Sequence, residues 1–336
     1  MQRAFILLLA LVSSPAALAF DQQTLMRAFF SIVLVRGYAE DGSLAYGSGV
    51  VIGDNQVVTN CHVLRKTRQA WVSQGEDAYP IVSVQADTRH DLCLLNTDKL
   101  PLKAAPLGSS NGLHKGNELF SIGHSNGVLA PLSSRGQIKS LYPYDNGHVV
   151  RSSARFSLGA SGSALFDDQG RLIGINTFKT PGRLAYFYAV PVEWVTQLAH
   201  APAQTKLPIS GQAFWELSDD EKPFFMQVAL PRLNDDWPKL LEVSQRWIMA
   251  EPGNAEAWYE LGSAQENLKQ SDAALRSYRK AAELDPQHSE ALYRLGVYAA
   301  QQGDRETTRS IGAKLATIDP ELAADYDKDT ACNLGC

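Results

Sequence analysis

The sequence predicts a chain of two differently built parts, an all-β unit followed by an array of helical repeats. From residue 29 to about residue 190, short apolar or alternating segments are separated by Gly, Asn, Asp or Pro, which is typical of strands and turns. Nearer the C-terminus, prolines recur every 34 residues, a period typical of helical repeats. The charge also differs: residues 1–209 carry 18 Lys/Arg and 14 Asp/Glu, whereas residues 210–336 carry 13 and 22.

Length and composition agree with a globular protein of two or three domains. The chain has 336 residues, of which 45% are hydrophobic and 20% are charged. Its net charge of −5 argues against nucleic acid as the main partner. No cofactor is expected. A metal site is not expected, because five of the histidines show no metal-ligand spacing: His114, His124, His148, His200 and His288.

Residues 1–19 have the pattern of a secretory signal peptide. Arg3 supplies a positive charge, residues 4–12 are apolar, and residues 17–19 (Ala-Leu-Ala) form a cleavage site that would leave Phe20 as the N-terminus. A membrane anchor is the alternative, but this apolar run is too short to span a bilayer. We therefore expect a periplasmic or secreted protein without stable membrane insertion.

The first part of the mature chain, residues 20–200, is expected to be one β-rich domain. Its predicted strands cover residues 30–38, 47–52, 56–59, 81–86, 92–97, 119–122, 172–178 and 186–190. Many short strands with almost no helical periodicity predict a barrel or a sandwich. A helix over residues 194–200 is expected to close this domain. Residues 201–215, which contain two prolines and a glycine, are expected to form a linker.

The second part, residues 216–325, matches the tetratricopeptide pattern of helix–turn–helix units. Pro252, Pro286 and Pro320 are spaced by 34 residues, and each follows an acidic residue. The middle unit carries the pattern residues Trp258, Leu261, Gly262, Ala274, Tyr278, Ala281 and Pro286. The small residues among them allow its two helices to approach closely.

The neighbouring units match the pattern less completely. The following unit has Thr308 and Gly312 where an alanine and an aromatic residue are usual, and the preceding one keeps only Phe224, Trp247 and Pro252. An unrelated helical bundle is the alternative, but so many matches at one period favour the repeats. Residues 326–336 are expected to form a tail with a cysteine pair.

Three motifs in the N-terminal part suggest nucleophilic catalysis. They contain His62 in TNCHV, Asp91 in HDLCLL and Ser161 in GASGS, and this chain order of base, orienter and nucleophile is that of chymotrypsin-type enzymes. A serine hydroxyl needs an imidazole to take its proton and a carboxylate to hold the imidazole in the right tautomer. Gly159 is expected to let its own N–H and that of Ser161 point at one developing oxyanion.

Each of these residues has a structural alternative. His62 could be a buried core histidine, Asp91 a turn residue before a strand, and Ser161 one serine of a flexible turn. All three in this order and in their own contexts favour a catalytic triad. The adjacent His90 is expected to point to the opposite side, because successive strand side chains alternate.

The four cysteines are expected to pair in an oxidising compartment. Cys61 precedes His62 and Cys93 follows Asp91 by two residues. If His62 and Asp91 touch, the two cysteines lie on adjoining segments, which favours a bridge over the alternative of two buried free thiols. Cys332 and Cys336 form a C-x3-C pair, for which a local disulfide is expected and a redox or metal role is the alternative.

Residues 29–200 resemble a bacterial trypsin-like protease of the HtrA/Deg type. The matching motifs are Gly47 to Ile52 (GSGVVI), Val57 to Val63 (VVTNCHV), Asp91 to Leu95 (DLCLL), Gly159 to Asp167 (GASGSALFD), Leu172 to Thr177 (LIGINT) and Tyr188 to Pro191 (YAVP). The resemblance implies two six-stranded barrels with the triad in the crevice between them.

The chain departs from that family in two ways. Ser163 stands where HtrA enzymes normally have glycine, a change that is also seen in bacterial glutamyl endopeptidases. Tetratricopeptide repeats take the place of the usual PDZ domain. The oligomeric cage and the PDZ-gated activation of the family are therefore not expected here.

The resemblance also suggests where the specificity pocket lies. Such enzymes line it with the segment before the serine and the strand after it, which here contain Arg155, Phe156, Asn176 and Thr177. Arg155 either lies in the pocket and favours an acidic substrate residue, or extends to solvent and leaves a small apolar pocket. We expect the second arrangement.

The sequence therefore predicts an exported serine endopeptidase with repeats that dock a protein substrate or partner. The alternative is a non-catalytic binding protein in which the repeats carry the function and the barrel is a scaffold. A hydrolase of small esters would share the chemistry, but nothing in the sequence resembles a lipid-binding lid.

Overall fold

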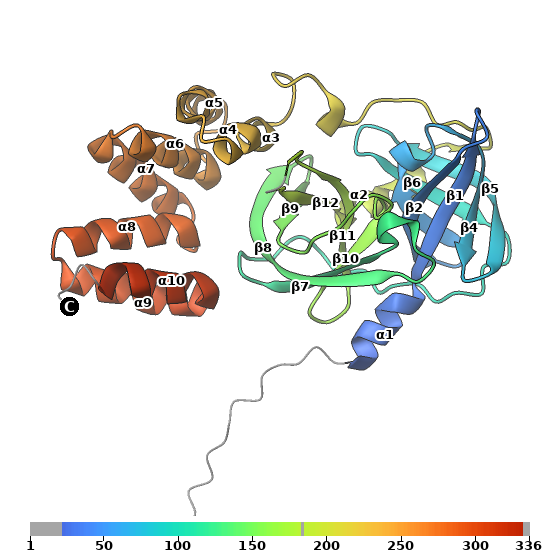
Figure 1. Cartoon of the computed structure of the whole chain (residues 1–336), viewed down its shortest axis with the longest axis horizontal. Helices are drawn as coiled ribbons and strands as arrows, with labels where there is room; N and C mark the ends of the chain where they lie inside the picture. Colours follow the sequence, from blue (N-terminus) through green and yellow to red (C-terminus); the bar gives the residue numbers. More distant parts are fainter. Residues whose placement is uncertain (1–21, 183–184, 332–336) are drawn as a thin grey trace, which may run out of the picture.

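The computed structural model describes residues 22–182 and 185–331. Along the chain, a short helix is followed by two β-barrels and then by a stack of helices (Figure 1). This arrangement confirms the predicted fold class, an all-β double barrel followed by helical repeats. The predicted signal peptide at residues 1–19 and the Cys332–Cys336 pair lie outside the described residues.

The first barrel follows helix α1 (Gln22–Phe30) and has six antiparallel strands. They are β1 (Ile32–Ala39), β2 (Leu44–Gly53), β3 (Gln56–Asn60), β4 (Thr67–Gln74), β5 (Asp77–Asp87) and β6 (Leu92–Thr97). Neighbours pair in the order β5-β4-β1-β2-β3-β6, and pairing between β5 and β6 closes the barrel. Val33, Val57 and Leu95 are among the side chains that fill its interior.

The second barrel repeats this architecture. Its strands are β7 (Glu118–Gly123), β8 (Leu132–Tyr144), β9 (Gly147–Ser152), β10 (Ser163–Asp167), β11 (Leu172–Lys179) and β12 (Phe187–Pro191). They close in the order β10-β11-β12-β9-β8-β7. The helix expected over residues 194–200 is present as α2 (Val192–Gln197) and the 3₁₀ turn η3 (Leu198–His200).

Four strands of the two barrels, β4, β8, β9 and β10, escaped the sequence prediction. β8 mixes polar residues with a glycine and a proline over its 13 residues, so its periodicity is broken. β10 has the sequence SALFD and is buried at every position, so it shows no alternation of apolar and polar residues. Strands of both kinds become recognisable only from their neighbours in the sheet.

The segment expected to be a linker is packed against the barrels instead. Residues 203–204 form the short strand β13 (Ala203–Gln204), which pairs with β5. Ile209 belongs to the core of the first barrel, and Phe214 is 1% exposed. This connection is held in place because its apolar residues fill gaps at the barrel surfaces, which its content of Pro and Gly does not reveal.

The helical part consists of two short helices followed by regular antiparallel ones. The helices are α3 (Phe224–Gln227), α4 (Ala229–Leu233), α5 (Trp237–Ala250), α6 (Ala255–Asn267), α7 (Ser271–Leu284), α8 (Ser289–Gln301), α9 (Arg305–Ile318) and α10 (Pro320–Ala331). The middle repeat corresponds to α6 and α7. Gly262 of α6 lies against the ring of Tyr278, where a Cβ atom would be 2.7 Å from the ring.

The last helix, α10, explains why the third repeat can lack its aromatic residue. In that unit Gly296 occupies the position of Gly262, but Gly312 stands where an aromatic is usual. Tyr326 of α10 fills the space: a Cβ atom at Gly296 would be 2.2 Å from its hydroxyl, and one at Gly312 would be 3.2 Å from its ring. The Tyr326 hydroxyl donates to the carbonyl of Thr308 at 2.8 Å. Residues 326–331, expected to begin a tail, therefore complete the repeats.

The helices pack against the second barrel and continue its core. Phe225 of α3 stacks on Tyr142 of β8, with ring centroids 4.5 Å apart. One buried cluster extends from Trp194 of α2 to Trp247 of α5.

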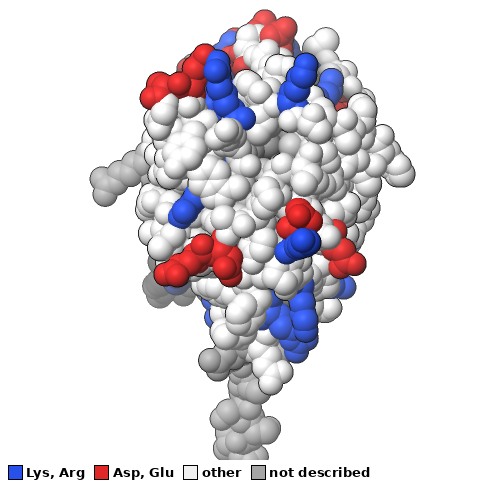
Figure 2. Space-filling model, turned by 90° about the vertical axis from the view of Figure 1, so that its right-hand side faces the viewer, with Lys and Arg blue, Asp and Glu red and all other residues white. Residues whose placement is uncertain are grey.

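On the face of the molecule at the first barrel, away from the helices, acidic and basic side chains are interspersed in small groups among wide uncharged areas (Figure 2). The described part of that face is not the strongly basic surface that nucleic acid binding requires.

Candidate active site

Asp91 ends the turn between β5 and β6 in a backbone conformation that suits an aspartate. Its φ is 60°, in the left-handed region that Asp and Asn tolerate better than most residues. The Asp91 carbonyl accepts hydrogen bonds from the backbone N–H of Cys61, at 3.1 Å, and from Nδ2 of Asn60, at 2.9 Å. The Asp91 side chain is fully buried. The turn is thus bound to the end of β3, directly before His62.

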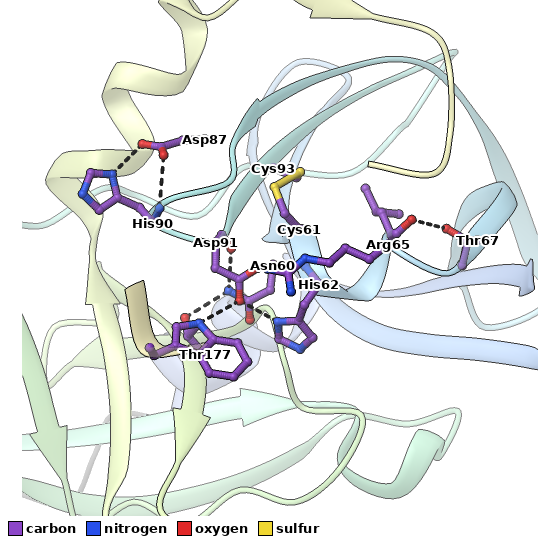
Figure 3. The surroundings of a disulfide bond; sticks show 12 residues. Asn60, Cys61, His62, Arg65, Thr67, Asp87, His90, Asp91, Cys93 and Thr177 are labelled. Carbon is purple, nitrogen blue, oxygen red and sulfur yellow. Dashed lines mark hydrogen bonds and ion pairs between the residues drawn. A yellow bond between two sulfur atoms is a disulfide. The ribbon is translucent and has the colours of Figure 1, made fainter. Parts of the chain in front are cut away.

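His62 lies on the 3₁₀ turn η1 (Cys61–Val63) and faces Asp91 (Figure 3). Its backbone N–H donates to Oδ1 of Asp91 at 2.8 Å, and its Nδ1 is 2.5 Å from Oδ2. Two contacts to one buried carboxylate fix both the backbone and the ring of this histidine. With Nδ1 carrying the proton toward Asp91, Nε2 is left as a proton acceptor.

The loop that carries Ser161 packs closely against β2 and the end of β3, which leads to His62. Its carbonyl accepts from the N–H of Ser48 on β2 at 2.8 Å. The next residue, Gly162, has a φ of 84°, and a Cβ atom there would be 2.2 Å from the Ser48 carbonyl and 2.4 Å from Oγ1 of Thr59. Only glycine fits this contact between the serine loop and the strand that leads to His62.

Within the described residues, the structure joins His62 to Asp91 but forms no hydrogen bond between His62 and Ser161. Among the described residues, neither Nε2 of His62 nor Oγ of Ser161 has a hydrogen-bond partner. The side chain of His62 is 24% exposed. Hydrogen bonds between catalytic groups are often long in a free enzyme and shorten when substrate binds, so this geometry is compatible with the predicted roles of His62 and Ser161.

The loop before Ser161 leaves two backbone N–H groups without partners in the described part of the chain, those of Gly159 and Ser161. Gly159 has a φ of 85°, and a Cβ atom there would be 2.6 Å from the ring of Tyr46. Oγ of Ser48 donates to the Gly159 carbonyl at 2.9 Å and accepts from the N–H of His124 at 2.8 Å. Burial, helped by the charge of Arg36, lowers the pKa of His124, which favours its neutral form beneath this loop.

Ser163 stands at a position where HtrA enzymes normally have glycine, and its side chain lies inside the second barrel. Its hydroxyl accepts from Nδ2 of Asn176 at 3.0 Å. The facing residue is Gly123, where a Cβ atom would lie only 2.2 Å from that of Ser163. The lack of a side chain at Gly123 thus offsets the extra atoms of Ser163.

Of the four expected pocket residues, Asn176 and Thr177 are buried, and both make hydrogen bonds to other buried side chains. Asn176 is 1% exposed and also donates to Oγ of Ser121, so it belongs to the barrel interior. Thr177 is buried and accepts from Nδ2 of Asn60 at 3.0 Å. Phe156 packs edge-on against Phe187. Asn176 and Thr177 therefore make buried hydrogen bonds, and their place in a substrate pocket stays a prediction.

Arg155 is exposed and points to a cavity of about 390 Å³ between the second barrel and the repeats. Whether Arg155 enters a substrate pocket stays a prediction. Its side chain shares the cavity with Arg151, Tyr186, Arg232 and Glu290.

Cys61 and Cys93 are joined by a disulfide, with Cα atoms 5.0 Å apart. The bond links the turn of His62 to β6, which begins directly after Asp91 (Figure 3). It thereby ties together the two segments that carry the predicted base and orienter.

His90 points away from His62, as expected. Its Nδ1 is 2.6 Å from Asp87, its Nε2 is 3.1 Å from Asp145, and its ring stacks on Trp194. The reason differs from the expected strand alternation, because His90 lies in the turn before β6.

Sequence reasoning missed several residues that support this site. Asn60 and Ser48 lie inside the quoted motifs. Their polar side chains were the signal that could have identified them, and in the structure Asn60 lies near His62 and Ser48 contacts Gly159. Trp215 was missed because it lies in the expected linker. Its Nε1 donates to Oδ2 of Asp91 at 3.2 Å.

Comparison with known proteins agrees with both parts of the fold. Residues 47–175 match the trypsin-like peptidase domain family, and residues 255–288 match the tetratricopeptide repeat. The mitochondrial serine protease HTRA2 of Bos taurus is 29% identical over 167 residues, which cover 47% of this chain and 36% of that protein. A probable periplasmic DegP-like serine endoprotease of Buchnera aphidicola is 29% identical over 168 residues, 46% of this chain and 36% of that one.

A solved structure with low sequence identity has a similar fold. The Rv3671c protease from M. tuberculosis, in its active form, aligns with a TM-score of 0.51 at 20% identity and covers 63% of this chain and 98% of that one. Among the first curated relatives, the match spans from 20% to 36% of their length. The chain thus carries a trypsin-like peptidase domain, similar to that of HtrA and DegP serine proteases, together with a tetratricopeptide repeat.

Proposed function

We propose that this protein is an exported serine endopeptidase with His62 as general base, Asp91 as its orienter and Ser161 as nucleophile. The contact between Nδ1 of His62 and the buried carboxylate of Asp91 carries the proposal. A carboxylate that is fully buried on an imidazole, beside a serine loop with open N–H groups, is the arrangement that acyl transfer requires.

The residues divide the reaction between them. His62 accepts the Ser161 proton at Nε2 as Oγ attacks the peptide carbonyl, and Asp91 stabilises the imidazolium that forms. The N–H groups of Gly159 and Ser161 donate to the oxyanion of the tetrahedral intermediate. His62 then gives its proton to the leaving amine, and water releases the acyl group from Ser161 by the same steps.

The repeats are proposed to dock a protein substrate or a partner protein. Tetratricopeptide units stack so that extended or helical segments bind along their surface. Residues 210–336 carry 13 Lys/Arg and 22 Asp/Glu, so this part favours neutral or basic segments. A purely non-catalytic role is not favoured, because the peptidase domain keeps all three triad residues.

Export is proposed from the pattern of residues 1–19 and from the periplasmic DegP-like relative. Within the described residues, none of the helices has the length and apolar character that a membrane span requires.

The proposed mechanism predicts that the triad residues act as one unit. On an unfolded substrate such as reduced casein, His62→Ala and Ser161→Ala should each lower kcat by at least about 10³-fold, and the double variant should lose little more. Peptide release is followed over time, with Ser153→Ala, an exposed serine outside the triad, as the control. Additive losses, or unchanged cleavage by Ser161→Ala, would contradict the triad.

A further inference from the structure

A second element reaches the His62–Asp91 pair from outside both barrels. Residues 211–217, which we call the strap, lie between β13 and α3 and contain the 3₁₀ turn η4 (Phe214–Glu216). In Figure 1 the strap is the yellow segment that crosses from the first barrel toward α3.

The strap is bound to the turn that ends in Asp91. The N–H of Phe214 donates to the carbonyl of Arg89 at 2.9 Å. Gly211 packs so closely on Thr88 that a Cβ atom would be 2.5 Å from that side chain. Within the strap, the N–H of Ala213 donates to the carboxylate of Glu216 at 2.9 Å. These contacts fix the strap against residues 88–89, three and two positions before the aspartate.

Trp215 contacts both members of the pair. Its indole Nε1 donates to Oδ2 of Asp91 at 3.2 Å, the same oxygen that faces Nδ1 of His62. The Trp215 ring also stands edge-on to the His62 ring, with centroids 5.5 Å apart and an interplanar angle of 83°. On its other side it stacks on Phe178 of the second barrel at 5.7 Å. The indole is therefore held between the two barrels where it limits movement of both triad side chains.

Glu216 binds the guanidinium of Arg65, which lies beside the carboxylate of Asp91. Arg65 has its Nη2 3.7 Å from Oδ1 of Asp91, and its Nη1 donates to Oε1 of Glu216 at 2.6 Å. The side chain of Arg65 is 19% exposed. Without Glu216, this guanidinium would have Asp91 as its nearest anionic partner and would compete with His62 for it.

We propose that Trp215 is a positioning residue of the protease site, which holds the Asp91–His62 pair through its indole N–H. This inference rests on the proposed function. It also means that the segment leading to the repeats is a structural part of the active site, so the two barrels alone do not supply the complete triad environment.

Trp215→Phe in the full-length chain tests the proposal, because it removes the N–H and keeps an aromatic ring. The control is Trp258→Phe, whose indole donates to the carbonyl of Pro252 at 2.9 Å, far along the chain on α6. We expect kcat on a short peptide to fall about tenfold in Trp215→Phe, which is about 1.4 kcal/mol, and to stay unchanged in the control. The concentration of folded enzyme is taken from titration to completion with a fluorophosphonate.

The pH dependence of kcat separates positioning from a general structural effect. With one donor fewer, the Asp91 carboxylate should stabilise the imidazolium of His62 more strongly, so the acid limb of the profile should move to higher pH. Glu216→Gln, which keeps the indole, should also lower kcat, because Arg65 is then free to approach Asp91.

Equal kcat and equal pH profiles in Trp215→Phe and Trp258→Phe would overturn the proposal. So would a lower kcat with an unmoved acid limb, since that indicates loss of packing alone. If instead wild type and Ser161→Ala cleave the peptide equally, the proposed function itself has failed, and the two results cannot be confused.

Discussion

The left-handed backbone at Asp91 shows how a single residue can position the site. Such a conformation costs about 1–3 kcal/mol for most non-glycine residues and persists where the surroundings hold it in place. Here the surroundings are hydrogen bonds from Asn60, Cys61 and His62. The aspartate can accept them with both its carbonyl and its carboxylate, which an asparagine would match only in part.

At the residue scale, the motifs predicted the residues of the proposed triad, because each lies in a local pattern that can be recognised alone. Residues 62 and 91 are indeed brought into contact. Trp215 lies 124 positions from Asp91 in the sequence and has no motif of its own. Contacts of this kind depend on how the chain returns after two complete barrels, which no local pattern encodes.

His90 gives a pH-dependent contribution to stability. Burial lowers its pKa, but Asp87 and Asp145 outweigh burial and raise the pKa above the usual 6.5. Arg89 also contacts Asp145, at 3.2 Å. Because the pKa is raised in the folded state, the contribution is fully present below about pH 6.5 and is lost as the pH rises through the raised pKa.

We therefore expect His90→Gln to lower the free energy of unfolding more at pH 5.5 than at pH 8.5, by about 1 kcal/mol. Urea unfolding of both proteins at the two pH values measures this difference. The same loss at both pH values would show that His90 acts only through packing on Trp194.

At the element scale, the turn before β7 docks on the ends of the repeat helices. Nζ of Lys115 lies 3.0 Å from Glu256 of α6 and 2.9 Å from Glu290 of α8. Burial lowers the pKa of Lys115, but the two carboxylates outweigh it and raise that pKa above the usual range. At Glu290, burial raises the pKa, but the charges of Lys115 and His288 outweigh burial and hold the pKa at about 2.

Lys115→Met should destabilise the protein by about 3–5 kcal/mol, because two largely buried carboxylates lose the lysine and keep only the imidazole of His288, at 3.1 and 3.5 Å, as a basic ion-pair partner among the described residues. The control is Lys139→Met, since the Lys139–Glu321 pair is 37% and 65% exposed, and its loss should cost at most about 1 kcal/mol. Chemical unfolding monitored by circular dichroism compares the two. Similar values for both variants would mean that Lys115 does not stabilise the contact between barrel and repeats.

The element scale also shows where sequence patterns stop being sufficient. The 34-residue period predicted the middle repeat, now α6 and α7. It did not predict that Tyr326 of α10 would replace the aromatic missing at Gly312. The substitution is visible only in space, because the ring comes from the next helix and not from the same repeat.

At the scale of the whole molecule, the two parts of the chain are joined more closely than a linker would allow. The strap reaches His62 and Asp91, α3 packs on the second barrel, and Lys115 binds the repeats. A chain that ends at Gly211 would lack Trp215 and is expected to lose activity on short peptides as well as on proteins. The role of the repeats in docking is thus best tested by substitutions on their surface in the full-length chain.

The central claim is that Ser161 is a nucleophile activated by His62. Reaction of the full-length protein with a fluorophosphonate, followed by peptide mass spectrometry, tests it most directly. We expect one phosphonyl adduct on Ser161 in the wild type, none in Ser161→Ala, and a rate at least about 10²-fold slower in His62→Ala. An adduct on another residue, or a rate on Ser161 that does not depend on His62, would contradict it.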